Sequence, residues 1–252
     1  MKIIYTENYE VMSAVTAQLI AAQIYRKPDC VLGLATGSTP LGTYAELIRM
    51  HRSQNLNFSK VRTVNLDEYK GLSPDSDQSY AYFMRENFFR HINIRPENTH
   101  VPNGLNPDED AACSCYERLI DDLGGIDLQL LGIGHNGHIG FNEPDDTFIM
   151  DTHAESLTEK TVRMNARFFE RIEDVPTRAY TMGIGQIMAA KTVILIANGA
   201  DKAETMARFA ERTIDPHFQG SILHAHRNAY VIADKAALSI LIKQAPQLIS
   251  NR

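Results

Sequence analysis

The chain has 252 residues, 44% of them hydrophobic and 22% charged, so it can bury a large core without a disulfide or a metal. Its formal net charge of −6 argues against general binding to nucleic acid or to an acidic membrane surface, because both favour a basic protein surface. No apolar stretch approaches the ~20 residues that a membrane span needs. We therefore expect neither a nucleic-acid nor a membrane partner.

Two further features indicate the cellular compartment. Met1–Tyr5 is followed at once by polar residues, which is unlike the longer apolar region of a signal peptide. The three cysteines, Cys30, Cys113 and Cys115, are an odd set without a paired framework and are expected to be reduced thiols. Both features predict a cytoplasmic protein.

Short apolar segments alternate with longer amphipathic ones along the chain. The apolar segments are predicted strands, in chain order Ile3–Tyr5, Val31–Ala35, Arg62–Asn65, Leu128–Ile133, Ala179–Met182, Val193–Ala197 and Ala229–Ala233. The amphipathic segments are predicted helices, in chain order Glu10–Tyr25, Thr43–Ser53, Tyr80–Phe89, Asp108–Leu123, Ala200–Arg212 and Lys235–Ala245.

This alternation predicts the fold class. Several strands, such as Val193–Ala197, are apolar at consecutive positions, as is typical of strands covered by helices on both faces. We predict an α/β fold with a doubly wound, mainly parallel, Rossmann-like sheet and helices on both faces. No long polar linker divides the chain, so residues 1–252 are expected to form a single domain.

In such sheets, ligands bind beyond the carboxyl ends of the strands, where loops lead into helices. The first of these loops runs from Ala35 to Pro40. Gly37 permits a tight turn, Ser38 and Thr39 offer hydroxyl and N–H groups, and Pro40 suits the first position of a helix. The loop fits both a phosphate site and an ordinary capped turn, and it lacks the spacing of a nucleotide P-loop.

Two carboxylates follow the third predicted strand. Asp67 and Glu68 come directly after Asn65 and Leu66. A carboxylate held at a strand end can act as a general base. Taken alone, the pair favours an acid pair at a helix N-terminus or solvated charges over a general base.

The segment Gly132–Pro144 carries four glycines, two histidines, two asparagines and a glutamate. The glycines let the backbone approach a ligand closely, and a histidine can transfer protons near neutral pH. Glu143 could orient an imidazole or stabilise its charge. His135 and His138 are too few ligands for a metal site, so no metal is expected. A purely structural turn is the alternative.

Basic residues could bind an anionic group near these loops. Lys202 lies close to a predicted helix start, after the strand Val193–Ala197. Arg163 and Arg167 lie one turn apart if this segment is helical. For each of them, a solvated surface charge is the alternative.

The sequence resembles a known family, the glucosamine-6-phosphate deaminases. The resemblance is carried by Val64–Tyr69, Gly132–Pro144, Gly37–Pro40 and Asn165–Phe169, and the segment around His138 is the most specific. It implies hydrolytic deamination and isomerisation of glucosamine 6-phosphate to fructose 6-phosphate and ammonia in amino-sugar catabolism, without a cofactor. Family members range from monomers to hexamers, so a homo-oligomer is possible.

The resemblance also implies roles for individual residues. Asp67 is expected to be the base that moves a proton between C2 and C1 of the sugar. His138 is expected to catalyse ring opening with the help of Asn136 and Glu143. The phosphate group is expected to bind at Gly37, Ser38, Thr39, Arg167 and Lys202.

The chain departs from the family pattern in two places. Many members carry aspartate where this chain has Asn136, so a full carboxylate–histidine–carboxylate relay is not available here. Allosteric members bind an acetylated aminosugar phosphate through basic residues shortly after the Asn-Glu-Pro motif. This chain has Asp145, Asp146, His153 and Glu155 in that stretch, so we expect a non-allosteric enzyme.

Three other functions are compatible with parts of the pattern. A 6-phosphogluconolactonase shares the fold but needs no base at C2, so Asp67 and the Asn-Glu-Pro motif favour the deaminase. A galactosamine-6-phosphate deaminase differs by one sugar epimer, and the sequence hardly separates the two. A sugar-phosphate sensor would bind without turnover, but the sequence has no DNA-binding appendage.

Overall fold

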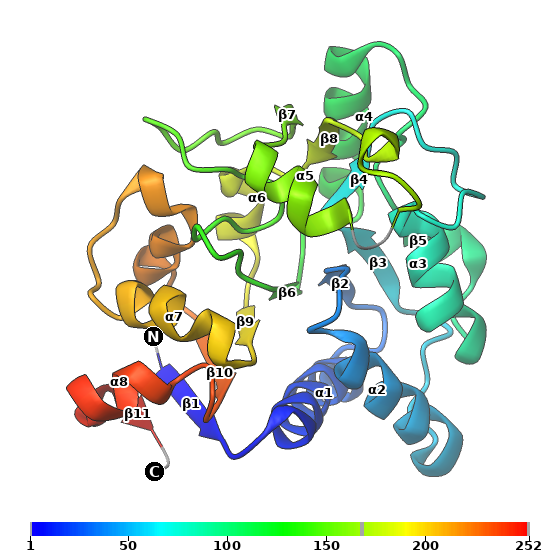
Figure 1. The fold of residues 1–252 in the computed structure, drawn as a ribbon. Helices are drawn as coiled ribbons and strands as arrows, with labels where there is room; N and C mark the ends of the chain where they lie inside the picture. Colours follow the sequence, from blue (N-terminus) through cyan, green and yellow to red (C-terminus); the bar gives the residue numbers. More distant parts are fainter. Residues whose placement is uncertain (1, 167–168, 251–252) are drawn as a thin grey trace.

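A parallel sheet forms the centre of the molecule (Figure 1). The computed structural model describes residues 2–166 and 169–250. Within them, eight strands pair in the order β11-β1-β10-β9-β6-β2-β3-β5, and each neighbouring pair is parallel. Their bounds are β1 Lys2–Thr6, β2 Val31–Leu34, β3 Arg62–Asn65, β5 Thr99–His100, β6 Leu128–Leu131, β9 Val193–Ala197, β10 Ala229–Asp234 and β11 Ile249–Ser250.

Helices cover both faces of this sheet. One face packs against α1 (Tyr9–Arg26), α2 (Leu41–Gln54) and α3 (Tyr80–Asn87), and the other against α4 (Glu109–Asp122), α6 (Ile184–Ala189), α7 (Ala203–Phe209) and α8 (Ser239–Gln244). Side chains of β9 show why consecutive apolar residues are needed. Ile194 and Ile196 pack in the core on the face covered by α1, α2 and α3, whereas Val193, Leu195 and Ala197 pack in the core on the opposite face. The predicted α/β class is confirmed.

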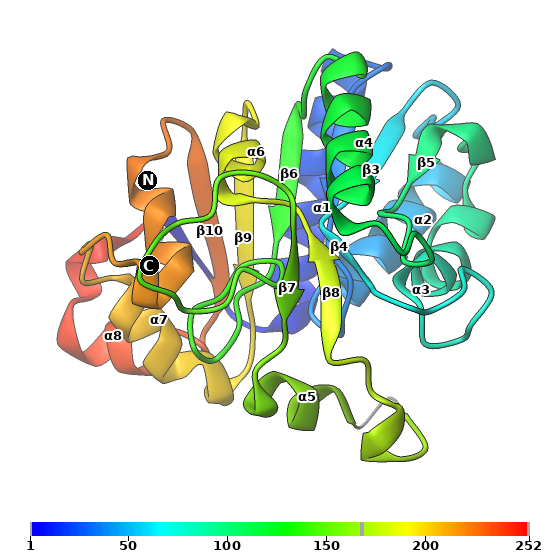
Figure 2. The same ribbon diagram turned by 90° about the horizontal axis from the view of Figure 1, so that it is seen from above.

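One predicted strand belongs to a different sheet. We expected Ala179–Met182 to join the parallel sheet, but β8 (Arg178–Thr181) pairs antiparallel with β4 (Asp67–Tyr69) and β7 (His153–Ser156). Figure 2 shows β7 and β8 side by side, with α5 (Glu159–Asn165) extending from the end of β7. The apolar pattern predicted the strand correctly, but such a pattern carries no information about the pairing partner.

The helix predictions are correct in place and less so in length. The segment Ala200–Arg212 begins as a 3₁₀ turn and becomes α7 only at Ala203, and α8 begins at Ser239 rather than at Lys235. The short helix α6 was not predicted. In the ranges that the structure describes, no helix combines the length and the apolar character needed to cross a bilayer.

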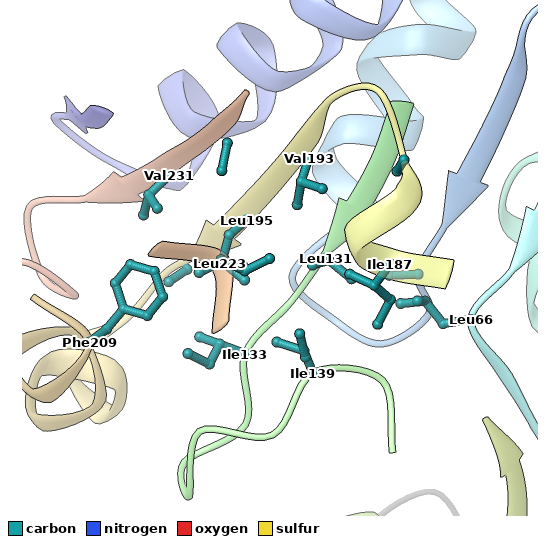
Figure 3. Close-up of a cluster of buried hydrophobic side chains, with 14 of the residues drawn as sticks. Leu66, Leu131, Ile133, Ile139, Ile187, Val193, Leu195, Phe209, Leu223 and Val231 are labelled. Carbon is teal, nitrogen blue, oxygen red and sulfur yellow. The ribbon is translucent and has the colours of Figure 1, made fainter. Parts of the chain in front are cut away.

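The glycine-rich loop after β6 is fixed at both ends by the hydrophobic core. Figure 3 shows Ile133 and Ile139 close together at the two ends of this loop, facing the cluster that contains Leu195 and Leu223. A β-carbon added at Gly220 would lie 3.2 Å from Ile133 Cδ1 and 3.5 Å from Ile139 Cγ2, so both side chains pack on this glycine. The loop between them is therefore held as a short, rigid excursion from the core.

Candidate active site

A cavity of about 620 Å³ lies beyond the carboxyl ends of β2, β3, β6 and β9. The order in which successive strands are added to the sheet reverses between β2 and β6, because β3 and β5 follow on one side and β9 and β10 on the other. Loops diverge at such a point and leave a crevice. All four loops selected from the sequence contribute to the cavity wall, and the volume suits a small phosphorylated sugar.

Asp67 lines this cavity and is only 7% exposed. It is the first residue of β4, where it pairs with Thr181, and the backbone before it is fixed because Met182 N donates to Leu66 O at 2.7 Å. None of the described residues donates a hydrogen bond to its carboxylate. Burial raises the pKa of Asp67 to about 8, and the neighbouring Glu68 charge adds to the rise.

Glu68 has a structural role that differs from that of Asp67. Its carboxylate accepts hydrogen bonds from Tyr69 N at 2.8 Å, Tyr80 N at 3.0 Å and Ala81 N at 2.9 Å. It therefore satisfies two amide groups in the first turn of α3 and fixes this helix beside β4. The helix-capping interpretation thus applies to Glu68, whereas Asp67 lines the cavity.

His138 is held against the backbone of its own loop. Gly134 N donates to His138 O at 2.9 Å, and a β-carbon added at Gly134 would clash with the imidazole ring. Glycine is therefore needed at this position, because the ring occupies the space of a side chain. His138 lines the same cavity as Asp67, as the sequence predicted.

Glu143 and Asn136 both contact His138. Glu143 Oε2 lies 3.5 Å from His138 Nδ1, and the same oxygen accepts a hydrogen bond of 2.6 Å from Asn136 Nδ2. Asn136 Oδ1 in turn accepts from His138 N at 3.2 Å. Burial alone would raise the pKa of Glu143, but His138, Thr161 and Asn136 outweigh this effect and lower it. Glu143 is thus an ionised carboxylate beside the imidazole.

The loop Ala35–Pro40 forms another part of the wall. Gly37 has φ 100°, a conformation that L side chains rarely adopt, so glycine is required there. Tyr9 fixes the loop, because its hydroxyl donates to Ser38 O at 3.1 Å and accepts from Gly42 N at 2.7 Å. Ser38 and Thr39 line the cavity at the start of α2, a site that favours an anion.

Lys202 lines the same cavity and contacts a histidine. Its Nζ lies 3.2 Å from His135 Nδ1, while His135 Nε2 lies 2.9 Å from Asp201 Oδ2. Lys202 is thus at the site, and Asp201 and His135 accompany it. Arg167, the other predicted phosphate ligand, lies outside the described residues. Arg163 pairs with Glu159 on the exposed side of α5 at 3.4 Å, as expected for a solvated helix face.

Several residues of the cavity wall were missed by the sequence analysis. Tyr69, Tyr80, Phe141 and Phe169 form a group of contacting rings, in which Tyr80 and Phe141 stack with centroids 6.0 Å apart. Thr161 was also missed, although its hydroxyl binds Glu143. Tyr69 and Phe141 flank the predicted site residues, which was the available signal.

No group of three or more His, Cys, Asp or Glu side chains within the described chain could hold a metal ion.

Comparison with known proteins decides the family. Residues 6–228 match the model of the glucosamine-6-phosphate isomerase and 6-phosphogluconolactonase family. The chain belongs to this family. It is 56% identical to the glucosamine-6-phosphate deaminase of Lachnoclostridium phytofermentans (strain ATCC 700394 / DSM 18823 / ISDg) over 92% of this chain and 98% of the relative. It is 52% identical to that of Thermoanaerobacter sp. (strain X514), over 96% and 95%.

Solved structures agree with this membership of the glucosamine-6-phosphate isomerase and 6-phosphogluconolactonase family. A monomeric glucosamine-6-phosphate deaminase aligns with TM-score 0.94 and 47% identity, over 95% of this chain and all of the other. The 6-phosphogluconolactonase of Trypanosoma brucei aligns with TM-score 0.74 and 20% identity, over 95% of this chain and 98% of the other. The second likeness shows the shared fold alone.

For this member of the family, the burial of Asp67 makes stability depend on pH. The unfolded chain ionises Asp67 near pH 4, whereas the folded protein holds the proton up to about pH 8. Its contribution to stability is therefore complete below about pH 4 and is lost as the pH rises to about 8. We expect Asp67→Asn to raise Tm by ~5 °C or more at the upper end of this window and to change it little at the lower end.

Differential scanning calorimetry of both proteins across this pH range measures the effect. A Tm difference that does not change with pH would contradict the raised pKa.

Proposed function

We propose that this enzyme is a glucosamine-6-phosphate deaminase that converts glucosamine 6-phosphate and water into fructose 6-phosphate and ammonia, with no cofactor. The observation that carries the proposal is that Asp67 and His138 line one cavity, and that Glu143 lies beside the imidazole of His138. The names of relatives that are 52% to 56% identical to the chain support the same activity.

Ring opening is the first step, and His138 is the group suited to it. The closed aminosugar loses the proton of its anomeric hydroxyl and gains one at the ring oxygen, which leaves an aldehyde at C1. An imidazole can accept the first proton and donate the second near neutral pH. Glu143 stabilises the imidazolium that forms between the two transfers, since its ionised oxygen is 3.5 Å from Nδ1.

Asp67 then moves a proton between neighbouring carbons. Its carboxylate removes the proton from C2 while the aldehyde oxygen is protonated, which gives an enolamine. The resulting carboxylic acid returns the proton to C1, and the C2–N bond becomes a ketimine. Water adds to C2 and ammonia leaves, which gives the ketone. Because the pKa of Asp67 is about 8, the ionised form that removes the C2 proton is the minor form near neutral pH, and the acid that forms can return the proton to C1.

The phosphate group orients the substrate for these transfers. Ser38 and Thr39 with the N-terminus of α2, together with Lys202, would supply donors from the cavity wall. We propose that Arg167 completes this group. Binding energy at the phosphate holds C2 beside Asp67, so a modest base becomes effective. We place the enzyme in the cytoplasm, where reduced thiols and sugar phosphates occur together.

Ammonia release from glucosamine 6-phosphate tests the activity, with the galactosamine epimer and 6-phosphogluconolactone as competing substrates. We expect ammonia from glucosamine 6-phosphate and a loss of about 100-fold or more in kcat for Asp67→Asn, since general base catalysis is worth at least that much. The variant should still bind substrate. Hydrolysis of the lactone as the best reaction, or near-normal turnover by Asp67→Asn, would remove the proposal.

Lys202→Ala tests the phosphate end of the cavity. Contacts to the phosphate are present in both the bound substrate and the transition state, so we expect KM to rise about 10-fold with a smaller change in kcat. Steady-state kinetics with Lys60→Ala, an exposed lysine away from the cavity, provides the matched control. An unchanged KM for Lys202→Ala would place this lysine outside the phosphate site.

We further propose that the enzyme is not allosteric. Asp145 and Asp146 are exposed, and His153 Nε2 lies 3.1 Å from Glu155 Oε2, so acidic groups occupy the stretch where a phosphate would need cations. We expect hyperbolic kinetics that N-acetylglucosamine 6-phosphate does not change. Sigmoidal rates that become hyperbolic on adding this compound would overturn the expectation.

A further inference from the structure

One oxygen of the Glu143 carboxylate is bound by a hydroxyl group of helix α5. Glu143 Oε1 accepts a short hydrogen bond from Thr161 Oγ1, and Thr158 Oγ1 lies 3.5 Å from the same oxygen. Thr158 is the N-cap of α5, because its Oγ1 accepts from Thr161 N at 3.2 Å. Thr161 is 6% exposed and lies at the cavity wall. A buried helix residue thus contacts the carboxylate that faces the imidazole.

The two threonine hydroxyls have complementary roles. Thr158 Oγ1 donates to Thr161 Oγ1 at 3.0 Å, so the Thr161 oxygen already accepts a hydrogen bond and its own proton is directed to Glu143. A hydroxyl group has a single proton to donate. Thr161 is therefore held as a donor to the carboxylate, and an ionised carboxylate, which only accepts, is the partner that this arrangement favours.

The other oxygen of the carboxylate, Oε2, contacts residues of the glycine-rich loop. Glu143 Oε2 accepts from Asn136 Nδ2 at 2.6 Å and lies 3.5 Å from His138 Nδ1. Within the described ranges, His138 Nδ1 is buried and has no partner that meets hydrogen-bond geometry. The rotation of the carboxylate about its side chain decides whether Oε2 can reach this nitrogen. Asn136 and Thr161 fix that rotation from opposite sides.

We propose that Thr161 is a positioning residue for the ring-opening step, because it holds Glu143 ionised and oriented toward His138. The proposal rests on the proposed function, in which His138 and Glu143 open the sugar ring. It adds a functional link from helix α5 to the imidazole. The competing explanation is that Thr161 only satisfies a buried oxygen and contributes to stability.

Removing the hydroxyl separates these explanations. Thr161→Val keeps the shape and loses the donor, so we expect kcat to fall about 10-fold, the factor expected for a hydrogen bond to a charged group, with KM nearly unchanged. The Thr161 hydrogen bond is among the interactions that lower the pKa of Glu143. Its loss should raise that pKa, so the acid limb of the kcat profile should move to higher pH.

Two matched variants complete the experiment. Thr161→Ser retains the hydroxyl and should restore kcat and the acid limb to near the wild-type values. Arg163→Ala changes an exposed side chain on the same short helix, 72% exposed, and should leave both unchanged. Thermal unfolding of each variant shows that the proteins are folded at the assay temperature.

The outcomes distinguish this inference from the proposed function. His138→Gln is measured in parallel on closed-ring substrate, and its full activity would remove the proposed role of the histidine. If His138→Gln is impaired while Thr161→Val keeps the wild-type kcat and pH profile, only the positioning role of Thr161 is wrong. Equal impairment of Thr161→Ser and Thr161→Val would also overturn it, because the hydroxyl would then not be the cause.

Discussion

The structure depends on one unfavourable feature, a buried carboxyl group that accepts no hydrogen bond from any residue in the described ranges. Asp67 is 7% exposed, and burial raises its pKa to about 8. An isolated aspartate in this setting favours the neutral form, so the fold must hold it there against its preference for water. The antiparallel pairing of β4 with β8 and the three hydrogen bonds accepted by Glu68 provide that support. Unfavourable burial of an ionisable group is typical of functional sites.

The proposed chemistry depends on two carboxylates in different surroundings, Asp67 in the cavity wall and Glu143 beside His138. Glu143 has several polar neighbours and a lowered pKa, whereas Asp67 accepts no hydrogen bond at its carboxylate from the described residues and has a raised pKa. Groups whose pKa values are separated in this way can act as a fixed negative charge and as a mobile proton carrier, respectively. The sheet brings them together because the loops after β3 and β6 both open at the reversal point between β2 and β6. The hydrophobic anchors Ile133 and Ile139 fix the second loop (Figure 3).

Much of the fold and most of the candidate site could be predicted from the sequence. Buried strands such as Val193–Ala197 are marked by consecutive apolar residues, and Asp67, Asn136, His138, Glu143 and Lys202 lie in or beside loops at strand ends. The partner of Ala179–Met182 was predicted wrongly, because an apolar pattern indicates burial but not which strands pair. The sequence did not indicate that Glu68 accepts hydrogen bonds from the first amides of α3, because this helix begins twelve residues later in the chain. The role of Arg167 stays a prediction.

Thr161 shows a second limit of sequence reasoning. It is separated from Glu143 by eighteen residues, and threonine is common on helix surfaces, so no local pattern marks it. The chain runs from the glycine-rich loop through β7 to α5 (Figure 2), and this path brings the Thr161 hydroxyl to the carboxylate. Hydrogen bonds that support a reacting group from outside the motif require coordinates to be found.

The central claim is that Asp67 is held protonated in the resting cavity, and infrared spectroscopy tests it most directly. The difference spectrum between wild type and Asp67→Asn isolates the carbonyl band of a single protonated carboxyl group. The account predicts that this band is present at about pH 6, where an ordinary aspartate is ionised, and disappears with a midpoint at about 8. Absence of the band at about pH 6 would contradict the account, because Asp67 would then be an ordinary ionised carboxylate.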